Sequence, residues 1–257
     1  MKDFNLKQYL EFMEDDMLIA CCTMQRTAAK ITKGIIPHIF NKSLNGQGEA
    51  NQIIELLRPF LLHCWISQIA RVKYEWLIYH LLSPSQLYSG QLMMPDYVLF
   101  VEPYSSITFE LCFVEVKRKG NHYKGNYESD LVKLGKEVQI TINKLVLQRV
   151  ANQEIVGLLI KEDHVATSFK MDLKYNGQYR MMKISEFNFI RKAPDDILLL
   201  PTIMEKLNQI KIILFNRIST STLKKLYEAL RNKDDQEDLT SYIRTPCTSP
   251  VHTKISQ

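Results

Sequence analysis

The sequence predicts an α/β protein in which helices flank a mixed β-sheet. Two short segments rich in β-branched and aromatic residues, 97–101 and 109–117, flank a turn at Pro103, which predicts a pair of neighbouring antiparallel strands. Residues 128–150 carry apolar side chains at steps of three and four, the period of an amphipathic helix. The apolar segment 154–161 follows that helix, and we expect it to form a buried strand beside the second strand of the pair.

The composition is that of an ordinary folded protein. The chain has 257 residues, of which 46% are hydrophobic, and its net charge of +5 permits an anionic partner without requiring one. The five cysteines form no C-x-x-C pair, so neither a disulfide framework nor a zinc knuckle is indicated. Charged residues interrupt the apolar stretches, and the amino terminus lacks a secretory apolar core. We therefore expect a soluble intracellular protein, nuclear or cytoplasmic, with no membrane partner.

Three parts of the chain are expected from the positions of loop-forming and polar residues. Residues 1–48 should form a helical extension that ends in a loop rich in Asn, Ser and Gly. Residues 49–231 should form the α/β domain together with its C-terminal helices. Residues 232–257 are polar and poor in bulky apolar side chains, so we expect a disordered tail.

Further elements are expected before the strand pair. The extension should contain helices near 6–20 and 25–40. A long helix over 49–70 should kink at Pro59, which lacks an amide hydrogen. Residues 74–82 contain Tyr, Trp and Ile, which favours a strand, although this segment can also end the preceding helix.

Two more features are expected toward the carboxyl terminus. A second hairpin, 166–175 and 178–186, should turn at Asn176-Gly177, a dipeptide that suits two consecutive positive φ angles. Residues 195–231 should be helical, with an apolar face at steps of three and four.

Charged residues mark the two ends of the predicted strand pair. Pro95-Asp96 precedes the first strand, and the second strand ends in Glu115-Val116-Lys117. Successive side chains of a strand point to opposite faces. One face of the second strand should therefore carry Phe109, Leu111, Phe113, Glu115 and Lys117. Charged groups in a strand that is apolar on both faces are costly to desolvate unless they have a partner or a function.

This pattern of Pro95-Asp96 followed on the next strand by Glu115-x-Lys117 resembles the signature of the PD-(D/E)XK nuclease superfamily. The resemblance covers residues 49–190 in the order of their elements and implies a restriction-endonuclease-like fold. Pro-Asp recurs at Pro194-Asp195 and acid-x-Lys at Asp172-Leu173-Lys174. Only the first Pro-Asp has an acid-x-Lys behind it on an apolar strand, and we assign the second acid-x-Lys to a plain hairpin.

The resemblance implies that Asp96 and Glu115 hold a divalent metal while Lys117 positions or activates the attacking water. Mg²⁺, with Mn²⁺ as the alternative, takes hard oxygen ligands and commonly uses only one or two protein carboxylates. The carbonyl oxygen of Val116 is a further candidate ligand. In the family, the helix before the hairpin often adds another acid, and Glu49 is preferred here over Glu55. Glu49 can equally be a solvated glutamate in the first turn of its helix.

Candidate contacts to nucleic acid lie next to this motif. Lys119 and Lys124 belong to a basic loop after the motif strand, which is either a solvated turn or a lip that holds phosphates. In the family, the helix after the motif strand often supplies polar or basic side chains, and Lys136 and Gln139 are the candidates. Lys133 lies further round that helix and is expected to be solvated.

Three functions follow from these expectations. The first is a Mg²⁺-dependent nuclease that hydrolyses phosphodiester bonds, with DNA as the expected partner. The alternative is a non-catalytic adaptor of the same fold that binds nucleic acid or protein. The third is an interaction protein in which Asp96, Glu115 and Lys117 form a structural ion-pair cluster. The complete motif favours the nuclease over the adaptor, whereas the modest net charge and the lack of an obvious DNA-binding appendage favour the adaptor.

Overall fold

The computed structural model describes residues 22–37, 39, 53–66, 72–81, 93–104, 107–117, 130–148, 150, 153–161, 164–175, 177–190, 194–218, 241 and 243–244. The expected helix over 6–20 therefore lies outside the described residues. None of the described helices is long and apolar enough to cross a membrane.

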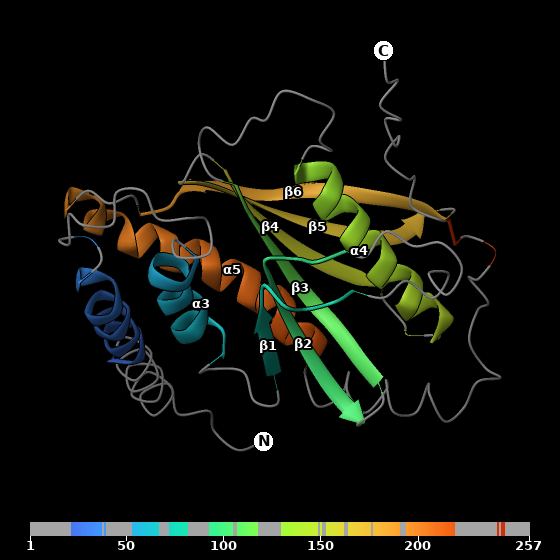
Figure 1. The fold of residues 1–257 in the computed structure, drawn as a ribbon, viewed down its shortest axis with the longest axis horizontal. Helices are drawn as coiled ribbons and strands as arrows, with labels where there is room; N and C mark the ends of the chain where they lie inside the picture. The colour runs from blue at the N-terminus through green and yellow to red at the C-terminus, as the bar shows by residue number, and fades with distance from the viewer. Residues whose placement is uncertain are drawn as a thin grey trace, which may run out of the picture.

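Six strands form one mixed sheet whose spatial order is the order of the chain, β1-β2-β3-β4-β5-β6 (Figure 1). Every neighbouring pair is antiparallel except β3 and β4, which are parallel. The strands are β1 (Val72–Trp76), β2 (Tyr97–Tyr104), β3 (Ile107–Lys117), β4 (Glu154–Lys161), β5 (Val165–Tyr175) and β6 (Gln178–Asn188). A parallel pair needs a crossover connection, and helix α4 (Asp130–Leu147) provides it between β3 and β4.

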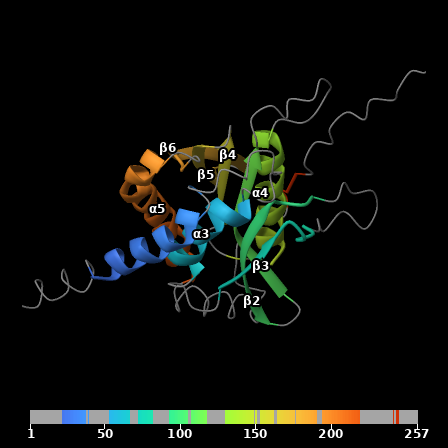
Figure 2. The same ribbon diagram turned by 60° about the vertical axis from the view of Figure 1, so that its left-hand side comes forward.

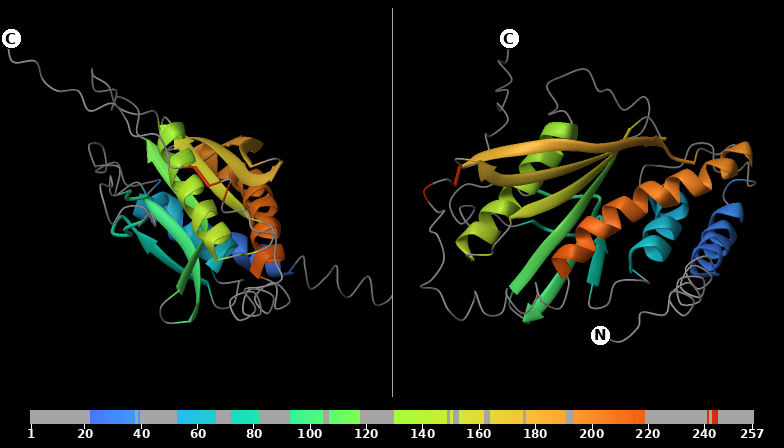
Figure 3. Two further views of the ribbon diagram at one scale, coloured as in Figure 1. Left: turned by 90° about the vertical axis from the view of Figure 1, so that its right-hand side faces the viewer. Right: turned by 180° about the vertical axis from the view of Figure 1, so that it is seen from behind.

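Helices cover both faces of the sheet. Helix α4 packs on β3 and β4 from one side, while α3 (Arg58–Cys64) and α5 (Leu200–Ile218) lie together on the other side (Figures 2 and 3). Trp65, just after α3, donates its indole N–H to the Leu207 carbonyl of α5 at 2.9 Å. The α/β class with a mixed sheet between helices is therefore confirmed.

The second helix of the expected amino-terminal extension packs on the core. Residues 22–37 are helical, and Ile31 and Ile35 of this segment are completely buried. The expected single helix over 49–70 is instead a π-helical turn, η2 (Ile53–Leu57), followed by α3. Pro59 stands in the first turn of α3, where a missing amide hydrogen breaks no helical bond.

Most strand predictions are confirmed within a few residues. The segment expected over 154–161 is β4, and the hairpin around Gly177 is β5 and β6, with φ of 70° at that glycine. The strand expected over 74–82 is the shorter and earlier β1. The helix expected from residue 195 begins as a 3-10 turn, η4 (Pro194–Leu199), and continues as α5.

One expectation about β3 is wrong because the strand contains a β-bulge. Leu99 pairs with Cys112 and Phe100 pairs with Glu110, so Leu111 is an extra residue in the ladder. A bulge reverses the alternation of side chains beyond it. Glu110 and Glu115 consequently both face α4, and Phe109 does not share the face of Phe113, Glu115 and Lys117.

The range expected to form a disordered tail includes three described residues. The backbone of Arg244 contacts α4 and β6: its carbonyl oxygen accepts hydrogen bonds from Gln139 at 3.1 Å and from Asn143 at 3.0 Å. Its amide donates to the hydroxyl of Tyr179 at 3.2 Å. This part of the tail is thus held against the domain.

Candidate functional site

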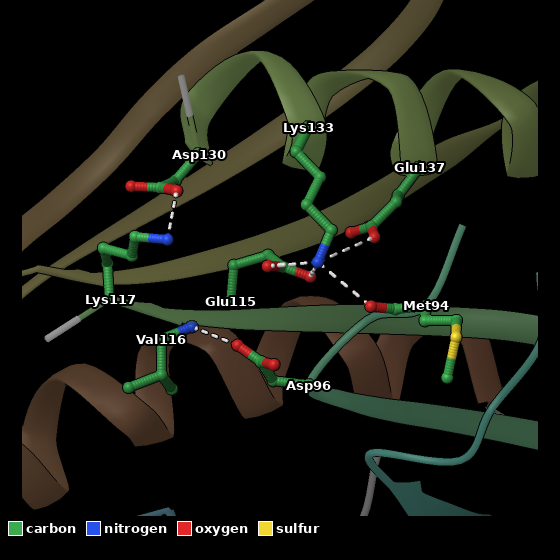
Figure 4. A network of polar contacts seen from close by, with 8 residues as sticks. All are labelled: Met94, Asp96, Glu115, Val116, Lys117, Asp130, Lys133 and Glu137. Carbon is green, nitrogen blue, oxygen red and sulfur yellow. Dashed lines mark hydrogen bonds and ion pairs between the residues drawn. The ribbon is translucent and has the colours of Figure 1, made fainter. Parts of the chain in front are cut away.

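The candidate site lies where the start of β2 meets the end of β3, beneath the first turns of α4 (Figure 4). Because β2 and β3 are antiparallel, the residue before β2 lies beside the last residues of β3. Asp96 is partly buried there, and its Oδ2 accepts a hydrogen bond from the backbone N–H of Val116 at 2.7 Å. The acid of Pro95-Asp96 is thereby fixed to the strand that carries Glu115 and Lys117.

Glu115 is only 5% exposed and is held by a lysine of α4. Lys133 Nζ donates to Glu115 Oε1 at 2.8 Å and to Oε2 at 2.7 Å. The same ammonium donates to the Met94 carbonyl oxygen at 3.0 Å. The expectation that Lys133 is solvated is therefore wrong, because the strand end offers it three acceptors.

Glu137 lies one turn further along α4 and adds a second buried carboxyl group (Figure 4). Its side chain is 0% exposed, and Oε1 lies 3.8 Å from Lys133 Nζ. Within the part of the chain that the structure describes, neither carboxyl oxygen of Glu137 has a hydrogen-bond partner. Glu115 and Glu137 thus face the same ammonium, and only Glu115 makes short hydrogen bonds to it.

Burial and mutual repulsion control the charge of these acids. Burial, reinforced by the charge of Asp96, raises the pKa of Glu115 to about 7, although Lys133 opposes the shift. Burial and the charge of Glu115 raise the pKa of Glu137 well above its usual range. For Lys133, burial favours the neutral amine, but the carboxylates of Glu115 and Glu137 outweigh it and raise the pKa. Lys133 is therefore a stable ammonium group inside an acidic cluster.

Lys117 stands at the same strand end and on the same face as Glu115, but it points to another acid. Its Nζ lies 3.6 Å from Oδ1 of Asp130, the first residue of α4. The Lys117 side chain is 36% exposed, so it remains accessible from outside. The structure brings Asp96, Glu115 and Lys117 together, and it adds Lys133, Glu137 and Asp130, which the sequence reasoning missed.

The remaining predicted residues are placed differently or lie outside the description. Lys136, a candidate contact to nucleic acid, is only 7% exposed. Gln139 uses its amide nitrogen to bind the Arg244 carbonyl, a contact within the protein. Glu55 lies in η2. Glu49, Lys119 and Lys124 lie outside the described residues.

The second acid-x-Lys is a plain hairpin pair, as expected. Asp172 of β5 is 1% exposed and accepts three hydrogen bonds of 3.0 to 3.2 Å from the Arg180 guanidinium group of β6. A buried carboxylate held in this way by arginine on the neighbouring strand stabilises the hairpin. Asp172 therefore provides a structural counterpart with which variants of Asp96 can be compared.

The donor atoms at the site suit a small divalent ion with few protein ligands. Among the described residues, no group of three or more His, Cys, Asp or Glu side chains is arranged to hold a metal. Asp96 and Glu115 do provide two hard carboxylates at adjoining strand ends, a number that Mg²⁺ commonly accepts when water completes its coordination. Beside them lies Glu137, a buried carboxyl group with no hydrogen bond to any residue that the structure describes. The residues present therefore fit Mg²⁺ or Mn²⁺ at a two-carboxylate site.

Chemically, the arrangement combines an acidic cation site with an accessible ammonium group. Asp96 and Glu115 can hold a cation, and the exposed Lys117 can meet an anionic substrate next to it. Asp130 holds Lys117 in place without burying it.

Comparison with known proteins adds no assignment: no protein-family model, no curated protein and no solved structure matches the chain.

Proposed function

We propose that the protein is a divalent-metal-dependent nuclease of the PD-(D/E)XK type, and that DNA is its substrate. The observation that carries the proposal is the hydrogen bond from the Val116 amide to Asp96. This bond joins the acid before β2 to the strand end that carries Glu115 and Lys117. Three residue types with the required chemistry therefore converge, although they are separated in the sequence.

Each residue has a distinct role in this proposal. Asp96 and Glu115 would hold Mg²⁺ or Mn²⁺, with the Val116 carbonyl as a further oxygen ligand. The bound ion supplies charge neutralisation at the phosphate and a more acidic water. Lys117 orients the attacking water or stabilises the negative charge that develops on the phosphate oxygens. Lys119 and Lys124, which follow β3 in the sequence, are the proposed phosphate contacts.

A non-catalytic adaptor is the second candidate, and one observation favours it. Lys133 binds both oxygens of Glu115, so the carboxylate is already neutralised by the protein itself. A cluster closed in this way stabilises the contact between α4 and β3 and needs no metal. The two candidates predict different responses to metal and to substitution.

Cleavage assays test the nuclease directly. The full-length protein is incubated with plasmid and single-stranded DNA in Mg²⁺, Mn²⁺ or EDTA, and cleavage should require the metal. Lys117→Ala should lower the turnover rate about a hundredfold or more while DNA affinity changes little, because Lys117 acts on the transition state. Lys161→Ala is the matched control, since the exposed Lys161 of strand β4 is the register partner of Lys117 on β3.

The outcomes separate the roles. A Lys117→Ala protein that cleaves at the wild-type rate removes Lys117 from the mechanism, and an equal loss in Lys161→Ala indicates a general effect of charge. A wild-type protein that binds DNA without cleaving it under any metal condition is an adaptor.

Melting curves test the metal site without a substrate. A divalent ion that binds only the folded protein stabilises it by about 2.7 kcal/mol at a hundredfold excess over the dissociation constant. Asp96→Asn should lose most of this gain. In EDTA it should be no less stable than wild type, because asparagine keeps an oxygen for the Val116 amide and removes the repulsion with Glu115.

Asp172→Asn is the control for a structural acid. It breaks the buried pair with Arg180, so it should destabilise the protein with or without metal and should leave the metal-induced shift intact. An Asp96→Asn protein that behaves like Asp172→Asn, together with no metal shift in wild type, identifies a structural cluster.

A further inference from the structure

We propose that Lys133 is a resident cation of the Asp96–Glu115 site, and that its ammonium group must move from Glu115 to Glu137 before a divalent metal binds. The proposal rests on the proposed function, because it assumes that Asp96 and Glu115 hold a metal. It assigns to α4 a pair of positioning residues that control access of metal to the site.

The first step is that Lys133 takes the positions that a metal would use on Glu115. Its Nζ lies within 2.8 Å of both carboxyl oxygens, and it also binds the Met94 carbonyl oxygen. An ion bound to the same oxygens at about 2.1 Å would lie within the space of this ammonium group. Two cations so close together repel strongly in a buried environment. Metal and Lys133 therefore compete for Glu115.

The second step is that α4 carries another acceptor within reach. Glu137 Oε1 lies 3.8 Å from Lys133 Nζ, four residues along the same helix, and its side chain is 0% exposed. A charge-assisted hydrogen bond has a length of about 2.8 Å, so a movement of roughly 1 Å is enough to form one. Neither oxygen of Glu137 has a hydrogen bond in the described structure, although a buried carboxyl group gains from one. Glu137 is thus placed to receive Lys133.

A second ion pair on the same two elements provides a comparison. Lys144 of α4 binds Glu110 Oε1 of β3, and the hydroxyl of Tyr79 donates to the same oxygen at 2.7 Å. Glu110 is 1% exposed, so this pair is buried as deeply as the first. In the described part of the chain, however, Lys144 pairs with a single acid, whereas Lys133 has two. Lys144 therefore serves as the matched control.

The experiment measures metal affinity in the full-length protein without nucleic acid. Mn²⁺ is titrated into wild type, Lys133→Met, Glu137→Met and Lys144→Met, and free Mn²⁺ is followed by electron paramagnetic resonance. Lys133→Met removes the competitor and should bind Mn²⁺ roughly tenfold more tightly. Glu137→Met removes the receiving group and should bind several-fold more weakly. Lys144→Met, which loses the same charge from the same helix, should match wild type.

The double variant Lys133→Met/Glu137→Met distinguishes competition from a simple change in local charge. If Glu137 acts by receiving Lys133, its loss matters little once Lys133 is absent, and the two effects are strongly non-additive. If both residues act only through their charge, the two effects add, and the proposal is overturned.

The remaining outcomes are equally informative. Tighter binding in Lys133→Met than in wild type supports the proposal when the effects in the double variant are also non-additive. Equal or weaker binding in Lys133→Met overturns it while the metal site of the proposed function stands. No binding in any variant overturns both. If Lys133→Met does not fold, Glu137→Met decides, because an apolar side chain is well tolerated at a fully buried position, and unchanged affinity there overturns the proposal.

Discussion

Two lysines lie at the end of β3, one on the strand itself and one on α4, and their surroundings suit them to different roles. Lys117 belongs to the strand, is 36% exposed and is held by Asp130, so it can reach a molecule outside the protein. Lys133 belongs to α4 and has its ammonium group enclosed by Glu115, Glu137 and the Met94 carbonyl (Figure 4). The two side chains are similarly exposed, at 36% and 31%, so the difference lies in their partners. Lys117 has an acid 3.6 Å away, whereas Lys133 makes short hydrogen bonds to both oxygens of Glu115 and to the Met94 carbonyl. Lys117 is accordingly the candidate for chemistry, and Lys133 controls the charge of the site.

The raised pKa of Glu115 predicts how stability depends on pH in the absence of metal. Its carboxyl group titrates near pH 7 in the folded protein and near pH 4.5 in the unfolded chain. Between these values the folded state keeps a proton that the unfolded state releases, so rising pH disfavours folding. The contribution is present below pH 4.5 and lost above about pH 7, with a size on the order of 3 kcal/mol.

Urea denaturation in EDTA from pH 5 to pH 8.5 measures this effect as the difference between wild type and Glu115→Gln. The difference should move in favour of Glu115→Gln as the pH rises, because glutamine still accepts from Lys133 and does not ionise. A difference that stays constant across this range contradicts the assignment.

The sequence alone predicted that Asp96, Glu115 and Lys117 lie close together, and the reason is geometric. Adjacent antiparallel strands place the residue before one strand beside the end of the next, and residues two apart on a strand share a face. The residues of α4 were harder to place. Leu131 belongs to the apolar stripe of residues 128–150 and is nevertheless 37% exposed, whereas the charged Glu137 is completely buried. The available signal was the spacing of four residues between Lys133 and Glu137, which allows them to pair on one helix face.

At the level of elements, α4 lies close to the sheet because β4 has a glycine beneath it. A Cβ atom added to Gly157 would lie 3.0 Å from Leu134 Cδ2 of α4. Leu134 is itself completely buried, so it has little space in which to move. The distance between α4 and β4, and with it the position of Lys133 over Glu115, therefore depends on this contact.

Gly157→Ala should destabilise the protein by about 1 to 3 kcal/mol, because the added methyl group overpacks the contact with Leu134. Leu134→Ala alone creates a cavity and should cost about 2 to 5 kcal/mol. The double variant should be more stable than the sum of the two losses predicts, since each change relieves the other. Denaturation curves of the three proteins provide the measurement.

Gly135→Ala is the control, because the nearest atom to its added Cβ is Met181 Sδ at 3.8 Å, an ordinary contact. In the interior of α4 this change should stabilise the protein by up to about 1 kcal/mol. If Gly157→Ala is equally harmless, the close packing of α4 on β4 is not what fixes the helix.

The elements that the sequence predicted well are those with a clear period or a clear turn. Strand β4, the β5–β6 hairpin and α4 belong to this group. The bulge at Leu111 was missed because β3 is apolar on both faces, so its sequence contains no alternation that a bulge would interrupt. The π-helical turn before α3 was missed for a similar reason, since an apolar stripe does not distinguish helix types.

At the level of the whole molecule, the sheet separates the candidate site from much of the apolar core. The site lies under α4, while α3, α5 and the helix of residues 22–37 build the packing on the other face (Figure 3). On that face Phe60 packs edge-on against Phe189 with ring centroids 4.7 Å apart. Substitutions among the acids and lysines of the site therefore leave this packing in place, and the variants proposed above test chemistry more than folding.

The carboxyl-terminal segment bridges α4 and β6, which predicts that its removal affects global stability. The Arg244 backbone binds Gln139 and Asn143 of α4 and Tyr179 of β6, and Ile243 packs on the core. Removal of residues 241–257 leaves the amide of Asn143, which is 5% exposed, without this acceptor. The expected loss is about 1 to 3 kcal/mol, the cost of unmade hydrogen bonds at partly buried groups. A chain that ends at Thr248 keeps Arg244 and is the matched control. Thermal and urea unfolding of both truncated proteins measure the difference directly, and equal stability of the two shows that the contacts of Arg244 contribute nothing to the fold.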